Sequence, residues 1–168
     1  MILKDLKIFL QNVRKNNFII NIILKVNHNF DIIFIQELSW TTIRSISSSD
    51  NCEGALLMGV VNHSNWFTFV REPNTINNCL RVIIIINIKL LSFRFSFCKD
   101  IINHRDILLV SFFNNGDIFW IMNVYSDSSH SVIKYLKDTE VDIHNLLVMT
   151  GDFNIRDNVW DPLFHHYY

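Results

Sequence analysis

The chain has 168 residues, of which 49% are hydrophobic and 18% charged, and its formal net charge is −1. This length suits one domain with a sizeable core, and the composition is too apolar for a disordered chain. The near-neutral charge excludes a general basic field, so a nucleic acid would have to be bound through a local patch or a metal site. The three cysteines, Cys52, Cys79 and Cys98, form no CxxC pair, which argues against a disulfide framework and against a zinc knuckle.

The amino terminus and the longest apolar run bear on localisation. The first ten residues, MILKDLKIFL, include three charged side chains, so they contain no signal-peptide core. The apolar run 82–86 is far shorter than the ~20 residues of a bilayer-spanning helix. We therefore expect a soluble, intracellular protein with no membrane partner. The nucleus is one compartment open to it, and its oligomeric state does not follow from the sequence.

The first part of the chain predicts strands that alternate with helices. Residues 6–10 form an apolar strand that ends in polar residues, and residues 18–26 carry apolar side chains close to the 3.6-residue period of a helix. Residues 31–35 predict a second, wholly apolar strand. Ser39 is a candidate cap for a short helix through 43–46. Strands of this apolar kind are covered on both faces, which indicates a layered α/β fold.

The middle of the chain predicts a β meander, either an antiparallel sheet or the edge of a larger one. Its strand-like segments are residues 53–61, 66–71, 80–90, 106–113 and 118–125. The sequence Asn114-Asn115-Gly116-Asp117 is typical of a hairpin turn.

A helix and a last strand follow the meander. Residues 129–138 predict the helix, with Ser128 or Ser129 as its cap, and residues 146–149 predict the strand.

The stretch 148–157, which reads VMTGDFNIRD, indicates a site most directly. The apolar run before it ends at Thr150-Gly151, where glycine permits a turn, and Asp152 and Asn154 follow. In extended backbone, residues i and i+2 point the same way, so these two side chains can share a metal ion with its water, or a phosphate held through a metal. An ordinary strand-to-loop turn is the alternative, since Gly, Asp and Asn are common turn residues.

Polar side chains occur at the ends of four predicted strands. Each one alone has an ordinary explanation as a turn residue, a solvated strand end or a half-buried aromatic. In layered α/β folds, however, sites collect at the carboxyl ends of strands, so the set indicates a functional site. Its members are Asn12, Glu37, Asn123, Tyr125, Asp152 and Asn154.

Four motifs resemble, in order and spacing, those of the endonuclease/exonuclease/phosphatase superfamily of metal-dependent phosphodiesterases. They are QNVRKN at 11–16, IQELSW at 35–40, MNVYSD at 122–127 and TGDFNIRD at 150–157. Their details look closest to the endonuclease-like domains of non-LTR retrotransposons. The resemblance spans nearly the whole chain but only about the first two thirds of a typical family domain. It implies a single domain over 1–168, a four-layer α/β sandwich of two packed mixed β-sheets flanked by helices, truncated so that it lacks the C-terminal strands.

The resemblance implies a divalent-ion site and a phosphate site. Glu37 would be the principal ligand of Mg²⁺ (or Mn²⁺), and Asn12 would support that metal site. Tyr125 would donate a hydrogen bond to the scissile phosphate, with Asn123 nearby shaping the pocket. These residue types fit phosphodiester hydrolysis, which needs a hard cation, a positioned water and donors for the transition-state oxygens.

The resemblance implies an endonuclease that hydrolyses DNA phosphodiester bonds. Asp152 would orient or activate the attacking water, and Asn154 would hold the phosphate and its developing charge. A phosphomonoesterase or inositol-phosphate phosphatase of the same superfamily is the alternative activity, and a catalytically inactive remnant of the fold is the alternative without activity.

One departure from the family bears on activity. The family pattern closes with a further Asp and an Asp-His motif, whereas Asp161, His165 and His166 follow the last motif too closely to take that role. Because losing one member of an acid–base set costs ~10²- to 10⁴-fold in rate, we expect the isolated chain to be a weak enzyme at best.

Basic residues in the middle of the chain could form a local patch, although scattered solvated charges are the simpler reading. They are Arg71, Arg81, Lys89, Arg94, Lys99 and Arg105.

Overall fold

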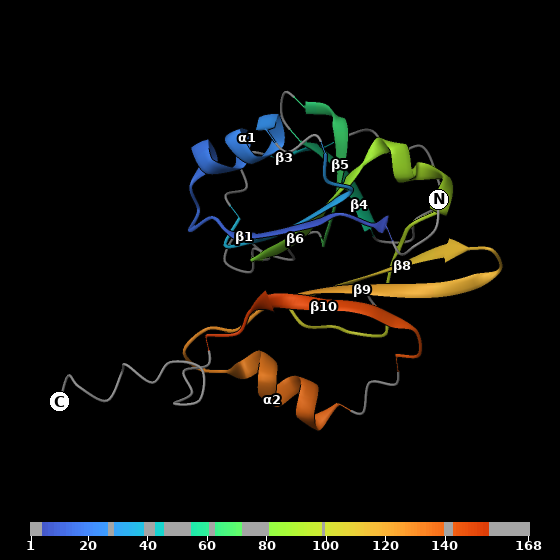
Figure 1. Ribbon diagram of the computed structural model, residues 1–168. Coiled ribbons are helices and arrows are strands. Elements are labelled where there is room, and N and C mark those ends of the chain that lie inside the picture. The colour runs from blue at the N-terminus through green and yellow to red at the C-terminus, as the bar shows by residue number, and fades with distance from the viewer. Residues whose placement is uncertain are drawn as a thin grey trace.

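The computed structural model describes residues 5–26, 29–38, 43–45, 55–60, 63–71, 81–98, 100–139 and 143–154. They form a four-layer α/β sandwich (Figure 1). From top to bottom in that view, the layers are helix α1 (Asn17–Val26), a six-stranded sheet, a four-stranded sheet and helix α2 (Ser131–Asp138). The predicted fold class, two packed mixed sheets flanked by helices, is therefore confirmed.

The six-stranded sheet joins the first part of the chain to half of the predicted meander. Its β1 and β2 run parallel, and every other neighbouring pair is antiparallel. Its strand order is β1 (Ile8–Asn12), β2 (Ile32–Gln36), β6 (Val82–Asn87), β5 (His63–Arg71), β4 (Ala55–Val60) and β3 (Ile43–Ser45).

The four-stranded sheet takes the other half of the meander, which is thus divided between the two sheets. Its β9 and β10 run parallel, and the remaining pairs are antiparallel. Its strand order is β10 (Leu146–Asp152), β9 (Asp117–Tyr125), β8 (Ile107–Asn114) and β7 (Ser96–Phe97).

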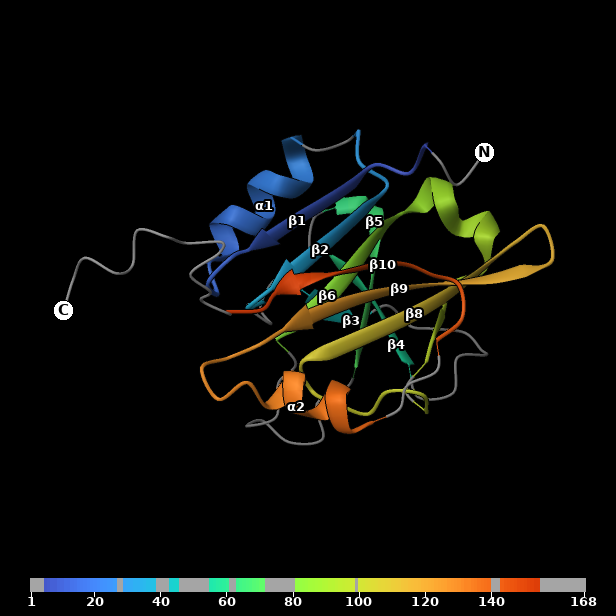
Figure 2. The same cartoon turned by 60° about the horizontal axis from the view of Figure 1, so that its bottom comes forward.

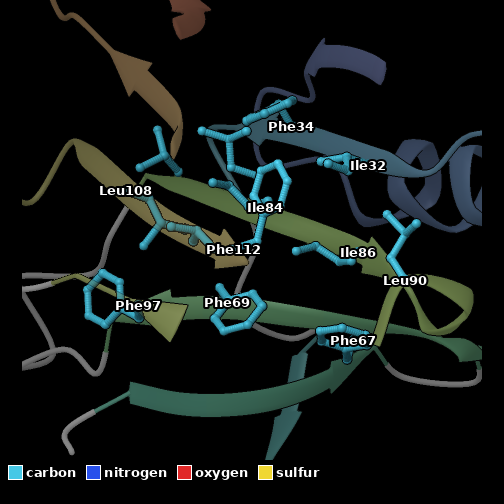
Figure 3. Close-up of a cluster of buried hydrophobic side chains, with 13 residues drawn as sticks. Ile32, Phe34, Phe67, Phe69, Ile84, Ile86, Leu90, Phe97, Leu108 and Phe112 are labelled. Atoms are coloured by element: carbon cyan, nitrogen blue, oxygen red, sulfur yellow. The ribbon is translucent and has the colours of Figure 1, made fainter. Parts of the chain in front are cut away.

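The central strands β2 and β6 are buried along their whole length because both of their faces are covered. On β2, Ile33 and Ile35 pack beneath α1, whereas Ile32 and Phe34 face the second sheet. Figure 3 shows this inter-sheet core, in which side chains of β2 and β6 meet those of β5 and β8, such as Phe112. A third cluster joins the outer face of β8 and β9 to α2. The alternation of side chains along each strand therefore builds the three interfaces between the four layers.

Two element predictions were wrong. Residues 43–45 form β3, which pairs with β4, so the helix predicted through 43–46 is absent there; Ser39 lies outside the described residues. The strand predicted over 80–90 ends at Asn87, whose side chain accepts the Lys89 N–H and caps the 3₁₀ helix η4 (Ile88–Phe93). A polar cap thus stops the strand although the following residues remain apolar.

The connections around β9 follow local backbone chemistry. The predicted hairpin turn between β8 and β9 is confirmed, with positive φ at Asn115 (53°) and Gly116 (93°). The predicted serine cap of α2 was wrong: His130 takes the N-cap position without a side-chain cap bond. Ser129 instead donates through both its N–H and its hydroxyl to Asp127.

In the part of the chain that the structure describes, neither helix has the length and apolar character needed to cross a bilayer.

Candidate functional site

The site lies where both sheets present the carboxyl ends of parallel strands. Strands β1, β2, β9 and β10 end on the same side of the molecule (Figure 2). The first sheet contributes Asn12 and Glu37 there, and the second contributes Tyr125 and Asp152. Two parallel pairs, packed face to face, therefore assemble residues that are far apart in the sequence.

The centre of the site is the side-chain amide of Asn12. Its Nδ2 donates to Glu37 Oε1 at 2.8 Å and to Asp152 Oδ2 at 2.8 Å. Its Oδ1 accepts the Arg14 N–H at 2.9 Å, which fixes the orientation of the amide. Both amide hydrogens are used, so one neutral group holds two carboxylates side by side.

Backbone bonds fix the loop that carries Glu37. Glu37 has a left-handed φ of 51°, and its carbonyl accepts the Lys15 N–H at 2.7 Å. The Val13 N–H donates to the carbonyl of Gln36 at 3.0 Å. The ends of β1 and β2 are thereby joined beyond the sheet ladder, which holds the Glu37 carboxylate at the edge of the sheet.

Tyr125 lies beside these carboxylates. It is the register partner of Asp152, and its phenol lies close enough to Glu37 for that carboxylate to affect its pKa. Burial raises the pKa of the Tyr125 phenol, and the negative charge and hydrogen bond of Glu37 raise it further, while Arg81 acts in the opposite direction. Tyr125 is therefore a neutral hydrogen-bond donor at physiological pH.

Gly151 sits within β10 and not in a turn, so the predicted role of this glycine was wrong. The strand continues to Asp152, and a Cβ at Gly151 would lie 1.9 Å from the carbonyl oxygen of Val124. Glycine is needed because the backbones of β9 and β10 approach closely. The Ser126 N–H donates to the Asp152 carbonyl at 2.7 Å, just beyond that approach. Together these contacts fix Asp152 opposite Tyr125.

Asn154 does not share its orientation with Asp152 as extended backbone would require. It has a left-handed φ of 47°, and its N–H donates to Asp152 Oδ1 at 3.1 Å. Its Nδ2 donates to the carbonyl of Ser126 at 2.5 Å. Asn154 thus lies next to the site and joins the loops that follow β9 and β10.

Asn123 is not brought together with the other five residues. It is fully buried between the sheets, where Nδ2 donates to the carbonyls of Ile35 (3.0 Å) and Ile83 (2.7 Å). Its Oδ1 accepts from Gln36 Nε2 at 2.6 Å. Asn123 therefore links β9 to β2 and β6 beneath the site and has no surface from which to touch a substrate.

The carboxylates fit a hard cation that keeps part of its water shell. Magnesium is typically held by one or two carboxylates with several waters, which matches Glu37 and Asp152. Asn12 directs its NH₂ group at both carboxylates and holds them in place, while its oxygen accepts the Arg14 N–H. Among the described residues, no group of three or more His, Cys, Asp and Glu side chains is arranged to bind a metal.

Sequence reasoning missed an ionic cluster beside Tyr125. Arg81 Nε and Nη2 donate to the two oxygens of Asp106 at 2.7 and 2.6 Å, and Nη2 also donates to Asp127 at 3.0 Å. The guanidinium carbon lies 4.5 Å from the centre of the Tyr125 ring. No local signal marks Arg81 in the sequence, because its place near the carboxyl end of β2 follows only from the antiparallel pairing of β6 with β2.

The basic side chains of the middle of the chain that the structure describes do not form one patch around the site. Lys89 follows the opposite end of β6 from Arg81 and pairs with Asp31 at 2.5 Å. The side chain of Arg71 and all of Lys99 lie outside the described part of the chain, as do Asp161, His165 and His166.

The fold and the site together define an α/β sandwich with two carboxylates held by an amide at the strand ends. No family model matches the sequence, and no curated protein matches it significantly. Among solved structures, the fold is similar to the endonuclease domain of TRAS1, a telomere-specific non-LTR retrotransposon, with a TM-score of 0.46 and 11% sequence identity. The similarity covers 79% of this chain and 49% of that domain, so the chain spans about half of its length.

Proposed function

We propose that this protein is a divalent-cation-dependent phosphodiesterase that cleaves the backbone of DNA as an endonuclease. The observation that carries the proposal is the bond pattern of Asn12, whose amide holds Glu37 and Asp152 together. Two carboxylates kept adjacent and half-exposed repel each other unless a cation joins them. The four sequence motifs that resemble the endonuclease/exonuclease/phosphatase superfamily supply the same residues.

In the proposed reaction, each residue acts on a defined part of the phosphodiester. Glu37 and Asp152 would hold Mg²⁺ or Mn²⁺, which when bound would polarise a phosphoryl oxygen. Asp152 would also orient the attacking water, because its carboxylate is fixed from both sides by Asn12 and by the Asn154 N–H. Tyr125 would donate its phenolic proton in a hydrogen bond to a phosphate oxygen, and Asn154 would contact the same phosphate.

Nicking of supercoiled plasmid tests the proposal. We expect Mg²⁺-dependent nicking that EDTA abolishes, and a loss of ~10²-fold or more in Glu37→Gln and in Asp152→Asn, which preserve shape while removing charge. Asp138→Asn is the matched control, since Asp138 is an exposed carboxylate at the end of α2, and it should nick at the wild-type rate.

Two results would point elsewhere. Faster metal-dependent hydrolysis of a phosphomonoester such as an inositol phosphate than of plasmid would favour the phosphatase alternative. Absence of hydrolysis of either substrate with Mg²⁺ or Mn²⁺ would reject the proposed function and favour an inactive remnant of the fold.

A further inference from the structure

Arg81 contacts both the Tyr125 ring and the buried carboxylate of Asp106. Arg81 precedes β6, and its side chain is 23% exposed. Arg81 donates three hydrogen bonds to carboxylates, two to Asp106 and one to Asp127. Its guanidinium group lies over the Tyr125 ring. A guanidinium bound in this bidentate way has little rotational freedom, so the ring beneath it packs against a fixed surface.

Asp106 holds Tyr125 a second time, through the backbone. Its side chain is 1% exposed, and its carbonyl accepts the Tyr125 N–H at 2.9 Å. One buried residue therefore fixes the main chain of Tyr125 directly and its ring through Arg81. Asp127, two residues after Tyr125, is fixed by the same guanidinium.

We propose that Arg81 is a positioning residue: anchored by Asp106 and Asp127, it holds the Tyr125 ring so that the phenol stays directed at Glu37 and at the phosphate site. This inference rests on the proposed function, in which Tyr125 donates to the substrate. Arg81 acts through Tyr125 and makes no substrate contact of its own.

The charges of the cluster support positioning over direct phosphate binding. Arg105 also pairs with Asp106 (3.3 Å) and with Asp127 (3.9 Å), so two guanidiniums face two carboxylates. The hydrogen bonds from Ser129 and then from Arg81 lower the pKa of Asp127 to about 2, and the carboxylate is ionised at neutral pH. Two positive and two negative charges leave no net positive field to attract a phosphate.

A double-mutant cycle in the plasmid-nicking assay tests the inference. Arg81→Lys keeps a positive charge for the buried Asp106 but cannot maintain the bidentate pair while also covering the ring. We expect kcat to fall ~10-fold with KM changed less than ~3-fold, because misplacing a catalytic group slows the chemical step. In a Tyr125→Phe background, the same substitution should change kcat less than ~2-fold, since the group it positions is gone.

Two further variants separate positioning from charge and from folding. Arg105→Lys alters the other guanidinium of the cluster and should retain wild-type kcat. Asp127→Asn removes one of the two anchors while leaving Asp106 paired, and it should lower kcat less than Arg81→Lys does. Thermal unfolding of each variant gives the folded fraction by which its rate is corrected.

The outcomes are distinct. Equal losses from Arg81→Lys with and without the Tyr125 hydroxyl would show that Arg81 acts independently of Tyr125 and would overturn the inference. Wild-type kcat in Arg81→Lys, or an equal loss in Arg105→Lys, would overturn it as well. A wild-type protein that does not nick DNA would instead reject the proposed function, and the inference with it.

Discussion

At the scale of single residues, Asn12 explains how two carboxylates are kept together without a third charge. A lysine or arginine in its place would cancel one of the two negative charges of Glu37 and Asp152 and weaken their attraction for a cation. An amide supplies two donors in a fixed plane and leaves both negative charges intact. The residue therefore stabilises the pair by hydrogen bonding and preserves both of the negative charges that the proposed cation site requires.

Replacing Asn12 by aspartate tests whether Glu37 and Asp152 form a cation site, without an activity assay. Asn12→Asp brings three carboxylates within hydrogen-bond distance, so we expect the free energy of unfolding to fall in EDTA because like charges repel. Millimolar Mg²⁺ should restore most of the loss, since an ion that binds only the folded state stabilises it. Thermal unfolding with and without Mg²⁺ measures both effects.

Asn12→Ala is the matched variant for that measurement, because it removes the same two hydrogen bonds and adds no charge. Its stabilisation by Mg²⁺ should not exceed that of the wild-type protein. No stabilisation by Mg²⁺ in the wild-type protein or in either variant would show that Glu37 and Asp152 do not form a cation site.

At the scale of elements, the β9–β10 pair determines where Asp152 lies. Gly151 allows the two parallel backbones to approach, and the next register pair is Tyr125 with Asp152. A side chain at position 151 would push against backbone atoms of Val124, which cannot rotate away. The position of the Asp152 carboxylate thus depends on the absence of a side chain at the preceding residue.

Gly151→Ala should therefore destabilise the protein and displace Asp152. The added Cβ would lie 1.9 Å from the Val124 oxygen, so β10 must shift. We expect a loss of about 3 kcal/mol or more, in the range of severe overpacking, and plasmid nicking reduced with it. Urea unfolding monitored by intrinsic fluorescence measures the stability.

Gly116, in the turn between β8 and β9, is the comparison for Gly151. Gly116 has nothing within 4 Å of an added Cβ but has a φ of 93°. Gly116→Ala should cost about 1–2 kcal/mol through backbone strain alone and leave nicking by the folded protein unchanged. If the two alanine variants lost equal stability, close approach of β9 and β10 would not be the reason for glycine at 151.

At the scale of the whole molecule, the sequence predicts the layers better than it predicts the contacts between them. The continuous apolar run of β2 indicates burial on both faces, and this is confirmed. The same prediction was wrong for β1, which lies at the edge of its sheet and has partly exposed side chains, Leu10 among them. The helix predicted through 43–46 fails because pairing with β4, a tertiary contact, decides the state of a three-residue segment. The local sequence pattern does not predict the state of a short segment such as β3, because strand pairing decides that state.

The same limit applies to the candidate site. Asn12, Glu37 and Asp152 are visible in the sequence because each follows an apolar run at a strand end. Arg81 is not, since its meaning depends on which strand β6 joins and on the buried Asp106 beneath it. Ion pairs and inter-sheet hydrogen bonds depend on how distant segments pair and pack, and a single sequence does not show that pairing.

Asn123 joins the two sheets that each supply half of the site, so the alignment of the two halves depends on its hydrogen bonds. Its amide satisfies the carbonyls of Ile35 and Ile83 and the side chain of Gln36 within the core. Asn123→Leu keeps the branched shape of the side chain but leaves these three groups without that partner, at about 1–3 kcal/mol for each buried group. We expect unfolding by urea to show a loss of about 3 kcal/mol or more.

The loss of nicking activity should exceed what the loss of stability explains. Without the bridge, the sheet that carries Asn12 and Glu37 is free to slide against the sheet that carries Asp152, and sub-ångström placement governs such catalysis. Ile121→Ala is the matched control: it lies on β9 in the same inter-sheet core, and its loss of about 2–5 kcal/mol comes from a cavity that breaks no polar bridge. Nicking rates per folded molecule, taken well below both unfolding temperatures, should be ~10-fold lower in Asn123→Leu than in Ile121→Ala. Equal rates would mean that apolar packing alone aligns the two halves of the site.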